Sequence, residues 1–477
     1  MRIVRGTAVA VLMAGALTGC TVGRDYARPE TSSPTIWRAP TEGAGSLADL
    51  EWWRLFEDPV LQSLIRTAID ENNDLRLAVA RVEEARAQLG IARAELLPQI
   101  DGRAGYSSQR SSEKSSPLRG QRGPNTPKAE NEFHSTGIDL SFELDLWGRL
   151  RRGTEAARAE LLATEEARRT VLTTLVSDVA QSYFDLIELD READVARRTR
   201  DSRRASLDLV QQRFEGGLTS DLDVQRARQE LASAAATVPD LERRIAQTEH
   251  RLSILLGKNP GAIARGTTLD QQTTPPAIPA GLPSDLLERR PDIRQAEQRL
   301  VAANAKVGQA KAEFFPRITL TSTYGVESAS LSDLFTGPAR AWQFGPTVSW
   351  PIFHGGRLKS NLRASESREL QALIGYQQTI QQAFREVEDA LVFQRKAAEI
   401  RLERQARVAA AERAVEIANL RYSNGLSSYL DVLDAQRQLF IAELELVAST
   451  RDQLTALVQI YKALGGGWEP QTGKVDR

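Results

Sequence analysis

The stretch Ile138-Asp139-Leu140-Ser141-Phe142-Glu143-Leu144-Asp145-Leu146 alternates without a break between apolar and polar side chains. Successive side chains of an extended strand point to opposite faces, so this pattern predicts one apolar face and one polar face. In a soluble sheet the apolar face would meet a core. A run of about nine residues is also the length of a tilted strand that crosses an outer membrane, apolar toward lipid and polar toward a lumen. We favour the membrane strand because other features of the chain agree with it.

Three weaker candidates accompany this strand, which we place at 137–147; they lie at 99–108, 317–326 and 344–353. Four strands cannot close a membrane barrel, which needs at least about eight. An open sheet edge in lipid would leave backbone groups unpaired, at a high cost in free energy. The strands must therefore be pooled between subunits. Three subunits give twelve strands, enough to leave a lumen.

The chain is an internal duplication. Residues 73–100 and 291–318 share 12 identities in 28 positions, and residues 213–231 and 421–439 share 9 in 19. Each half reads helix, strand, strand, long helix, turn, helix. The predicted organisation is a signal peptide over 1–19, an N-terminal segment over 20–57, a first repeat over 58–256, a linker over 257–283, a second repeat over 284–464 and a C-terminal tail over 465–477.

Apolar residues recur at helical spacing in long alanine-rich stretches with charged faces, which is typical of coiled-coil helices. The longest of these stretches have about 60 residues, which corresponds to roughly 90 Å of helix. The predicted helices cover 58–97, 154–214 and 222–256 in the first half, and 283–315, 357–422 and 430–464 in the second. The predicted fold class is an α+β membrane protein, in which a trimer builds both a coiled-coil α-helical barrel and a transmembrane β-barrel.

The only cysteine, Cys20, ends an apolar run that follows Arg2 and Arg5. A positive start, a short apolar run and small residues are typical of a secretory signal. The sequence Leu17-Thr18-Gly19-Cys20 resembles a bacterial lipobox, which implies cleavage before Cys20 and covalent N-acyl and S-diacylglycerol lipid on it. Because Thr21 rather than an acid follows, we expect sorting to the outer membrane, with the mature N-terminus anchored at its surface.

The charge and the motifs exclude several functions. Without Arg2 and Arg5 the net charge is about −3, which argues against nucleic acid as a partner. The three histidines are scattered, and we find no metalloprotease, nucleotide-binding or serine-hydrolase motif. We therefore predict no enzyme, no metal site and no cofactor other than the lipid.

Several segments in combination resemble the outer membrane factor family. These are the lipobox, Trp52-Trp53-Arg54-Leu55-Phe56-Glu57-Asp58-Pro59, Leu286-Leu287-Glu288-Arg289-Arg290-Pro291-Asp292-Ile293 and the twin GLxSxLDV turns. The resemblance covers almost the whole mature chain. It is closest to the lipoprotein branch that serves resistance-nodulation-division (RND) pumps. It implies a homotrimeric outer-membrane exit duct with a periplasmic helical tunnel, a periplasmic adaptor protein and an inner-membrane RND-type pump as partners.

The two helical turns are predicted at 215–221 and 423–429, at the end opposite the barrel. The resemblance implies that an adaptor docks on them, through Gly217, Leu218 and Ser220 in the first turn and Gly425, Leu426 and Ser428 in the second. The glycines allow the backbone to reverse.

Acids follow each turn. Asp431 and Asp434 lie three residues apart on one helix face, and by resemblance they line the narrow periplasmic mouth in three copies, together with Asp223. Tyr422 is expected to bond an acid of a neighbouring helix. Asp223 and Asp431 also fit a simpler role as acids that favour the helix N-terminus. In some members of the family that the chain resembles, an arginine in this turn helps to hold the gate shut. Here Ser427 and Ser428 occupy the turn, so the resemblance does not extend to that arginine.

Three alternatives stay open. The same architecture fits an outer-membrane channel for type I protein secretion or for metal-ion export. A non-conducting coiled-coil lipoprotein that scaffolds the envelope is the third, and the alternating strand at 138–146 argues against it. The sequence does not identify the cargo.

Overall fold

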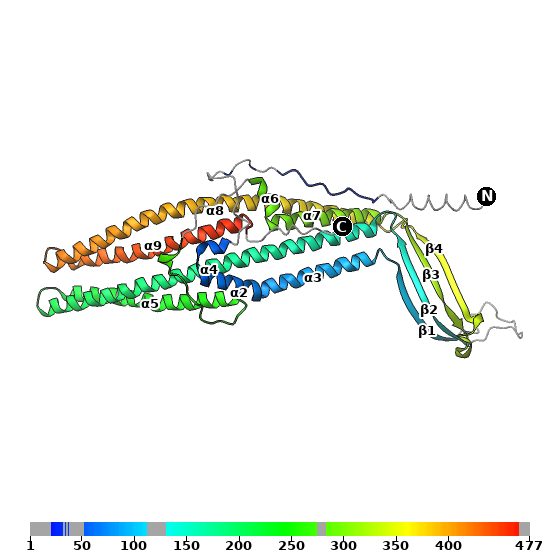
Figure 1. Ribbon diagram of the computed structural model, residues 1–477, viewed down its shortest axis with the longest axis horizontal. Coiled ribbons are helices and arrows are strands. Elements are labelled where there is room, and N and C mark those ends of the chain that lie inside the picture. Colours follow the sequence, from blue (N-terminus) through cyan, green and yellow to red (C-terminus); the bar gives the residue numbers. More distant parts are fainter. Residues whose placement is uncertain are drawn as a thin grey trace. The chain divides into compact units, whose positions relative to one another are not determined.

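A computed structural model describes residues 21–31, 34, 37, 52–110, 112, 130–273 and 283–466. In chain order the main elements are α2 (Pro59–Glu71), α3 (Asn73–Ala94), β1 (Gln99–Arg110), β2 (Glu130–Leu144), α4 (Arg149–Glu215), α5 (Asp221–Leu255), α6 (Leu286–Arg289), α7 (Pro291–Ala312), β3 (Arg317–Ser328), β4 (Arg340–Ser349), α8 (Arg357–Ser423) and α9 (Tyr429–Ala463) (Figure 1). Short 3₁₀ turns are η1 (Trp52–Phe56), η2 (Leu269–Gln271), η3 (Pro283–Asp285), η4 (Leu331–Asp333) and η5 (Gly337–Ala339).

The duplication is visible in the helix lengths. Helices α3 and α7 have 22 residues each, α4 and α8 have 67 each, and α5 and α9 have 35 each. A 67-residue helix is roughly 100 Å long. The three longest helices of the first repeat therefore have counterparts of equal length in the second. No helix in the described part of the chain is both long and apolar enough to cross a membrane.

The chain divides into two compact units. The first comprises Met1–Pro29, Glu83–Ala163 and Glu297–Gly375, and it contains the sheet. The four strands pair antiparallel in the order β1-β2-β3-β4 (Figure 1). Strands β1 and β4 each pair on one side only among the described residues, so the sheet has two open edges.

The register separates the side chains of the sheet by polarity, as the alternation in β2 predicted. One face is largely apolar and includes Ile100, Tyr106, Ile138, Leu140, Phe142, Ile318, Leu320, Tyr324, Trp342, Phe344 and Val348. The other face is polar and includes Asp101, Arg103, Asp139, Ser141, Glu143, Thr319, Thr321, Thr323, Glu327, Gln343 and Thr347. Large apolar side chains stay exposed on the first face; Trp342 is 75% exposed. A soluble core does not leave them so, and a lipid-facing surface does.

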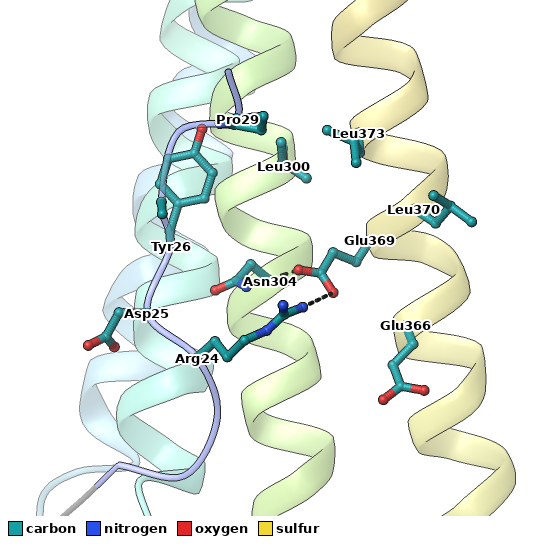
Figure 2. Close-up of a pocket in the computed structure, with 11 residues that line it drawn as sticks. Arg24, Asp25, Tyr26, Pro29, Leu300, Asn304, Glu366, Glu369, Leu370 and Leu373 are labelled. Atoms are coloured by element: carbon teal, nitrogen blue, oxygen red, sulfur yellow. Dashed lines mark hydrogen bonds and ion pairs between the residues drawn. The ribbon is translucent and has the colours of Figure 1, made fainter. Parts of the chain in front are cut away.

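The N-terminal segment of this unit runs along the helices. The backbone N–H of Val22 donates to the carbonyl of Trp147 (3.0 Å), directly before α4. Further along, Arg28 pairs with Glu297 on α7 (2.6 Å). A cavity of about 350 Å³ lies between this segment, α7 and α8. Leu300 and Leu373 line its apolar part, while Asn304 donates to Glu369 (3.0 Å) at its polar part (Figure 2).

The second unit comprises Glu30–Val82, Thr164–Ala296 and Tyr376–Arg477, and it holds the largest hydrophobic core. Turn η1 inserts Trp52 and Phe56 into this core, where Trp52 stacks on Tyr461 of α9 (5.3 Å between ring centroids) and Phe56 packs on Phe184 of α4 (5.0 Å). Burial of each such ring stabilises the fold by about 2–3 kcal/mol. The tryptophan motif is thus a packing element.

The helix predicted over 58–97 is two helices, because the chain leaves helical geometry at Asn72 (ψ 130°). The Asn72 side chain donates to the carbonyl of Leu255 (2.9 Å) and accepts from the N–H of Leu75 (2.9 Å), which fixes the break. The helix predicted from 283 begins at Pro291, since the residue before a proline disfavours helical geometry. Strand β2 begins earlier than predicted, at Glu130, and the strand predicted at 344–353 lies at Arg340–Ser349.

Candidate functional site

The two turns between long helices have the same backbone design. The N–H of Leu218 donates to the carbonyl of Arg213, and the N–H of Leu426 donates to that of Arg421, both at 2.8 Å. The intervening Gly217 and Gly425 have φ values of 73° and 72°, which a residue with a Cβ rarely adopts. The i to i+5 bond and the left-handed glycine define a Schellman motif. The repeats thus end in two equivalent tips, which we call tip 1 (216–220) and tip 2 (424–428).

Each tip presents one leucine to solvent. Leu218 is 71% exposed and Leu426 is 68% exposed. Ser220 and Ser428 take the N-cap positions of α5 and α9. An exposed apolar side chain at the end of a helical hairpin is available to a partner. The structure therefore places all six predicted docking residues on the two tips.

The acids after tip 2 lie on an exposed part of α9. Asp431 accepts hydrogen bonds from the backbone N–H (3.0 Å) and the hydroxyl (3.2 Å) of Ser428, which completes a capping box. Asp434 lies one turn further along the helix and is exposed. Asp431 thus has a local structural role, whereas Asp434 presents an exposed charge whose field acts on Arg437 of the same helix.

Asp223 belongs to the other hairpin. Its carboxylate accepts from the hydroxyls of Thr219 (2.7 Å) and Ser220 (3.1 Å) and lies 3.6 Å from Arg226. Within the described residues of one chain, Asp223 therefore stabilises its own turn, and its proximity to Asp431 or Asp434 stays a prediction.

Tyr422 differs from its expected environment. Its ring packs against Tyr429 (5.4 Å between centroids), and the guanidinium of Arg213 lies 4.8 Å from the ring centroid. Its hydroxyl is buried without a hydrogen-bond partner among the described residues, so the expected bond to an acid is not formed within the chain. Arg213 also donates to the carbonyl of Ser423 (3.4 Å). An arginine at the end of α4 thus connects the first hairpin to the end of α8, rather than an arginine within the turn itself.

Below the tips a polar cluster joins the two hairpins. The side chain of Arg203 on α4 is 4% exposed, donates to Gln436 on α9 (2.8 Å) and lies 3.8 Å from Glu230 on α5. Glu230 also pairs with Arg437 of α9 (2.6 Å). Burial lowers the pKa of Arg203, and the Glu230 carboxylate opposes that shift. Sequence reasoning missed these four residues, which we call the seam cluster, because nothing in a helix with many arginines singles out position 203.

An apolar layer separates the seam cluster from the turns. It contains Val210, Val224, Ala227, Ala418, Tyr422, Tyr429, Val432 and Leu433. Burial raises the pKa of the Tyr429 hydroxyl to about 12, so this group stays neutral in the layer. The hairpins are therefore packed against each other just below the tips. Cys20, the predicted lipid site, lies outside the described residues.

The open-edged, half-apolar sheet and the two acid-bearing hairpins define a class of protein, the subunit of an outer-membrane channel with a helical extension. A family model described as outer membrane efflux protein matches residues 64–258 and 282–466, and the chain belongs to that family.

Relatives of this family are similar over nearly their full length. The chain is 38% identical to the probable efflux pump outer membrane protein TtgC of Pseudomonas putida, covering 97% of this chain and 95% of that protein. It is 36% identical to the cation efflux system protein CusC of Escherichia coli O6:H1, covering 95% and 97%.

Solved structures agree with these relatives. The outer-membrane channel OprN matches with a TM-score of 0.87 at 31% identity, over 94% of this chain and 100% of that chain. The open state of the Neisseria gonorrhoeae MtrE outer membrane channel matches with a TM-score of 0.82 at 31% identity, over 95% and 100%.

The comparisons confirm the predicted fold class, function and location. The protein is an outer-membrane exit duct of an efflux pump, with its helical tunnel in the periplasm. The scaffold alternative is therefore wrong. The relatives include both drug or solvent and cation efflux proteins, so similarity alone does not select the cargo.

Proposed function

We propose that three copies of this chain form a passive channel, not an enzyme, whose periplasmic mouth is closed by Asp431 and Asp434. The observation that carries the proposal is the exposed position of both carboxylates just inside tip 2. Three copies would bring six like charges to a narrow opening. Such a ring repels itself and is expected to bind cations or to share hydrogen bonds when it is shut.

The gate is tested with two double variants of the purified, reconstituted trimer. Asp431→Asn/Asp434→Asn removes both charges but keeps an acceptor for the cap, whereas Asp431→Ala/Asp434→Ala also removes the cap, which costs about 1 kcal/mol. We expect both to raise resting single-channel conductance several-fold over the wild type.

The matched control is Asp194→Ala/Asp240→Ala. This variant removes two exposed acids that pair with arginines on α4 and α5. We expect it to conduct like the wild type. Unchanged conductance in both gate variants, with the trimer intact by light scattering, would exclude the assignment of the gate.

Opening requires the two hairpins of each subunit to change their packing. The Arg203–Glu230–Arg437 ion pairs and the contact of Arg213 with Tyr422 hold α4 and α5 against α8 and α9. We infer that the seam cluster favours the shut state. In that case Asp223 and Tyr422 each stabilise the packing of their own hairpin, and they do not form a hydrogen bond that joins the two hairpins.

We assign the six tip residues to docking of a periplasmic adaptor, with an inner-membrane RND-type pump completing the assembly. Leu218 and Leu426 provide the same apolar contact twice per subunit. Drugs or other small molecules are the proposed cargo. Metal ions are the second candidate, supported by the similarity to a cation efflux protein, and transport assays with each cargo class decide between them.

We also propose that Cys20 carries the N-acyl and diacylglycerol lipid. Thr21 and Val22 lie against Gly148 and Trp147, next to the end of β2, where a membrane strand would leave the lipid. Mass spectrometry of the mature N-terminal peptide tests this directly, since an unmodified Cys20 would contradict it.

A further inference from the structure

One row of the sheet lacks large side chains on its polar face. The register aligns Arg103 of β1 with Gly137 of β2, Gly325 of β3 and Ala341 of β4. All four residues belong to the polar face, because they alternate with the apolar set. The only long side chain in this row is therefore that of Arg103.

The two glycines are required by the backbone. A Cβ on Gly137 would lie 2.6 Å from the carbonyl oxygen of Tyr324, and a Cβ on Gly325 would lie 2.4 Å from that of Thr136. Real Cβ atoms essentially never make contacts this short, so neither position accepts a side chain without a shift of the strands. Strands β2 and β3 thus form a bare floor at this height.

Arg103 lies between two acids beside this floor. Its Nε is 3.7 Å from Asp139 of β2, and its terminal nitrogen is 4.0 Å from Glu327 of β3. To reach Glu327 the arginine must cross β2, which the bare Gly137 permits. The hydroxyl of Thr323 donates to Asp139 (2.9 Å) and holds that carboxylate in place.

These ion pairs have long distances and are partly exposed to solvent. The side chain of Arg103 is 46% exposed, and those of Asp139 and Glu327 are 36% and 39% exposed. Exposed pairs of this kind contribute little to stability. Their charges instead stay available to ions in the lumen, where polar-face substitutions tune selectivity.

We propose that Arg103, Asp139 and Glu327 form a charged ring in the barrel lumen, and that Arg103 limits the preference of this ring for cationic solutes. The proposal rests on the trimeric barrel proposed above. Each subunit contributes these two acids and one arginine, and Asp101, which lies opposite Asp139 on the same face, adds a third acid. The net charge at this height is therefore −2 per subunit. The ring favours cations, and loss of Arg103 makes that preference stronger.

The test is a charge-selective thiol probe that does not depend on the periplasmic gate. Ser135 lies on the same face, directly opposite Glu327 in the register, and becomes the reporter Ser135→Cys. The full-length trimer is treated with a cationic (trimethylammonium) and an anionic (sulfonate) methanethiosulfonate reagent, with the parent chain as the blank for Cys20. The ratio of the two modification rates reports the local potential.

Adding Arg103→Gln should raise the cation-to-anion rate ratio roughly three-fold at about 0.1 M salt, and less at 1 M, where charges are screened within a few ångströms. Glu327→Gln should lower the ratio by a similar factor, and Arg103→Lys should leave it unchanged. Arg110→Gln is the matched control. It removes the same charge from the end of β1, where Arg110 pairs with Glu130 on the other face of the sheet.

The proposed ring is wrong if the rate ratio stays unchanged in Arg103→Gln and Glu327→Gln, or if Arg110→Gln changes it equally. If the Arg103→Gln variant does not assemble, two other variants decide whether the ring exists: Glu327→Gln should lower the rate ratio, and Arg103→Lys should leave it unchanged. Light scattering separates this result from failure of the trimer, because a parent chain that is not trimeric contradicts the proposed function before any probe is applied.

Discussion

Asp58 shows how much one buried residue can organise. It is 0% exposed, and one carboxylate oxygen accepts from the backbone N–H groups of Val60 and Leu61, which caps α2. The other oxygen accepts from the hydroxyl of Tyr183 (2.7 Å) and the side-chain amide of Gln272 (2.8 Å). One side chain thus connects the start of α2, the middle of α4 and the segment that follows α5.

Asp58→Ala is expected to destabilise the protein by about 2–4 kcal/mol, because it leaves several buried donors without an acceptor. Tyr183→Phe removes one donor to Asp58 and the acceptor of the Gly266 N–H (3.1 Å), and should cost only about 1–2 kcal/mol. Thermal unfolding of the full-length protein, followed by circular dichroism, measures both. Equal melting temperatures for the two variants would contradict a role for Asp58 beyond its bond to Tyr183.

The segment from Trp52 to Pro59 is distinctive in the sequence, but the sequence alone does not show that it packs into the core. Its cap on α2 was foreseeable, since an acid before a proline is a common helix start. The partners Tyr183 and Gln272 were not, because they lie over 120 positions away and only tertiary packing brings them to Asp58.

At the scale of elements, α4 and α9 share a buried ionic contact. Glu188 of α4 is 7% exposed and accepts from Arg451 of α9 (2.9 Å). Burial raises the pKa of Glu188 to about 7, while Arg451 opposes the shift and the nearby carboxylates of Glu192 and Asp185 add to it. The side chain is therefore close to its titration point near neutral pH.

This raised pKa predicts a pH dependence of stability. The pKa of Glu188 in the folded protein lies above the unfolded value of about 4.5, so the folded state binds this proton more tightly than the unfolded state does. The resulting stabilisation of the folded protein is fully present below pH 4.5 and is lost as the pH rises through about 7. The loss of stability is on the order of 3 kcal/mol. Glu188→Gln should flatten the fall in melting temperature between pH 5 and pH 7.5.

The flattening should be partial, since burial also raises the pKa of Asp185 and of Glu192. Arg451 keeps Asp452 as a partner at 3.2 Å, so the substitution does not leave it unpaired. Melting curves of wild type and variant that stay parallel across this range would show that Glu188 is ionised throughout.

Element types and order were predictable because periodicity, glycines and prolines act locally. The long helices and both turns follow from those signals. The break at Asn72 was not predictable, since the carbonyl of Leu255 that fixes it comes from another helix. The seam cluster escaped for the same reason: arginines that look solvated in the sequence, such as Arg203, are buried by a neighbouring hairpin.

For the whole assembly, the paired tips predict adaptor binding through two equivalent sites per subunit. Leu218→Asp/Leu426→Asp should reduce co-purification of the adaptor at least ten-fold, because a charge replaces the apolar contact at both sites. Leu331→Asp is the control; this leucine is 64% exposed but lies in η4, between β3 and β4. Each single tip variant should have an intermediate effect, and full binding by the double variant would exclude the tips as the docking site.

The even number of strands has a consequence for how the molecule is threaded. In an antiparallel sheet with an even number of strands, the chain enters and leaves at the same end of the strands, and the register accordingly brings Gln99, Leu144, Arg317 and Ser349 to one end. The helices that flank all four strands must leave from that end. Where two subunits of the barrel meet, β4 of one lies beside β1 of the next, and these two strands are antiparallel. The boundary between subunits therefore has the same strand directions as the sheet inside a subunit. With three or five strands per subunit, each boundary between subunits would join two parallel strands, and one end of the chain would lie on the opposite side of the membrane from the other.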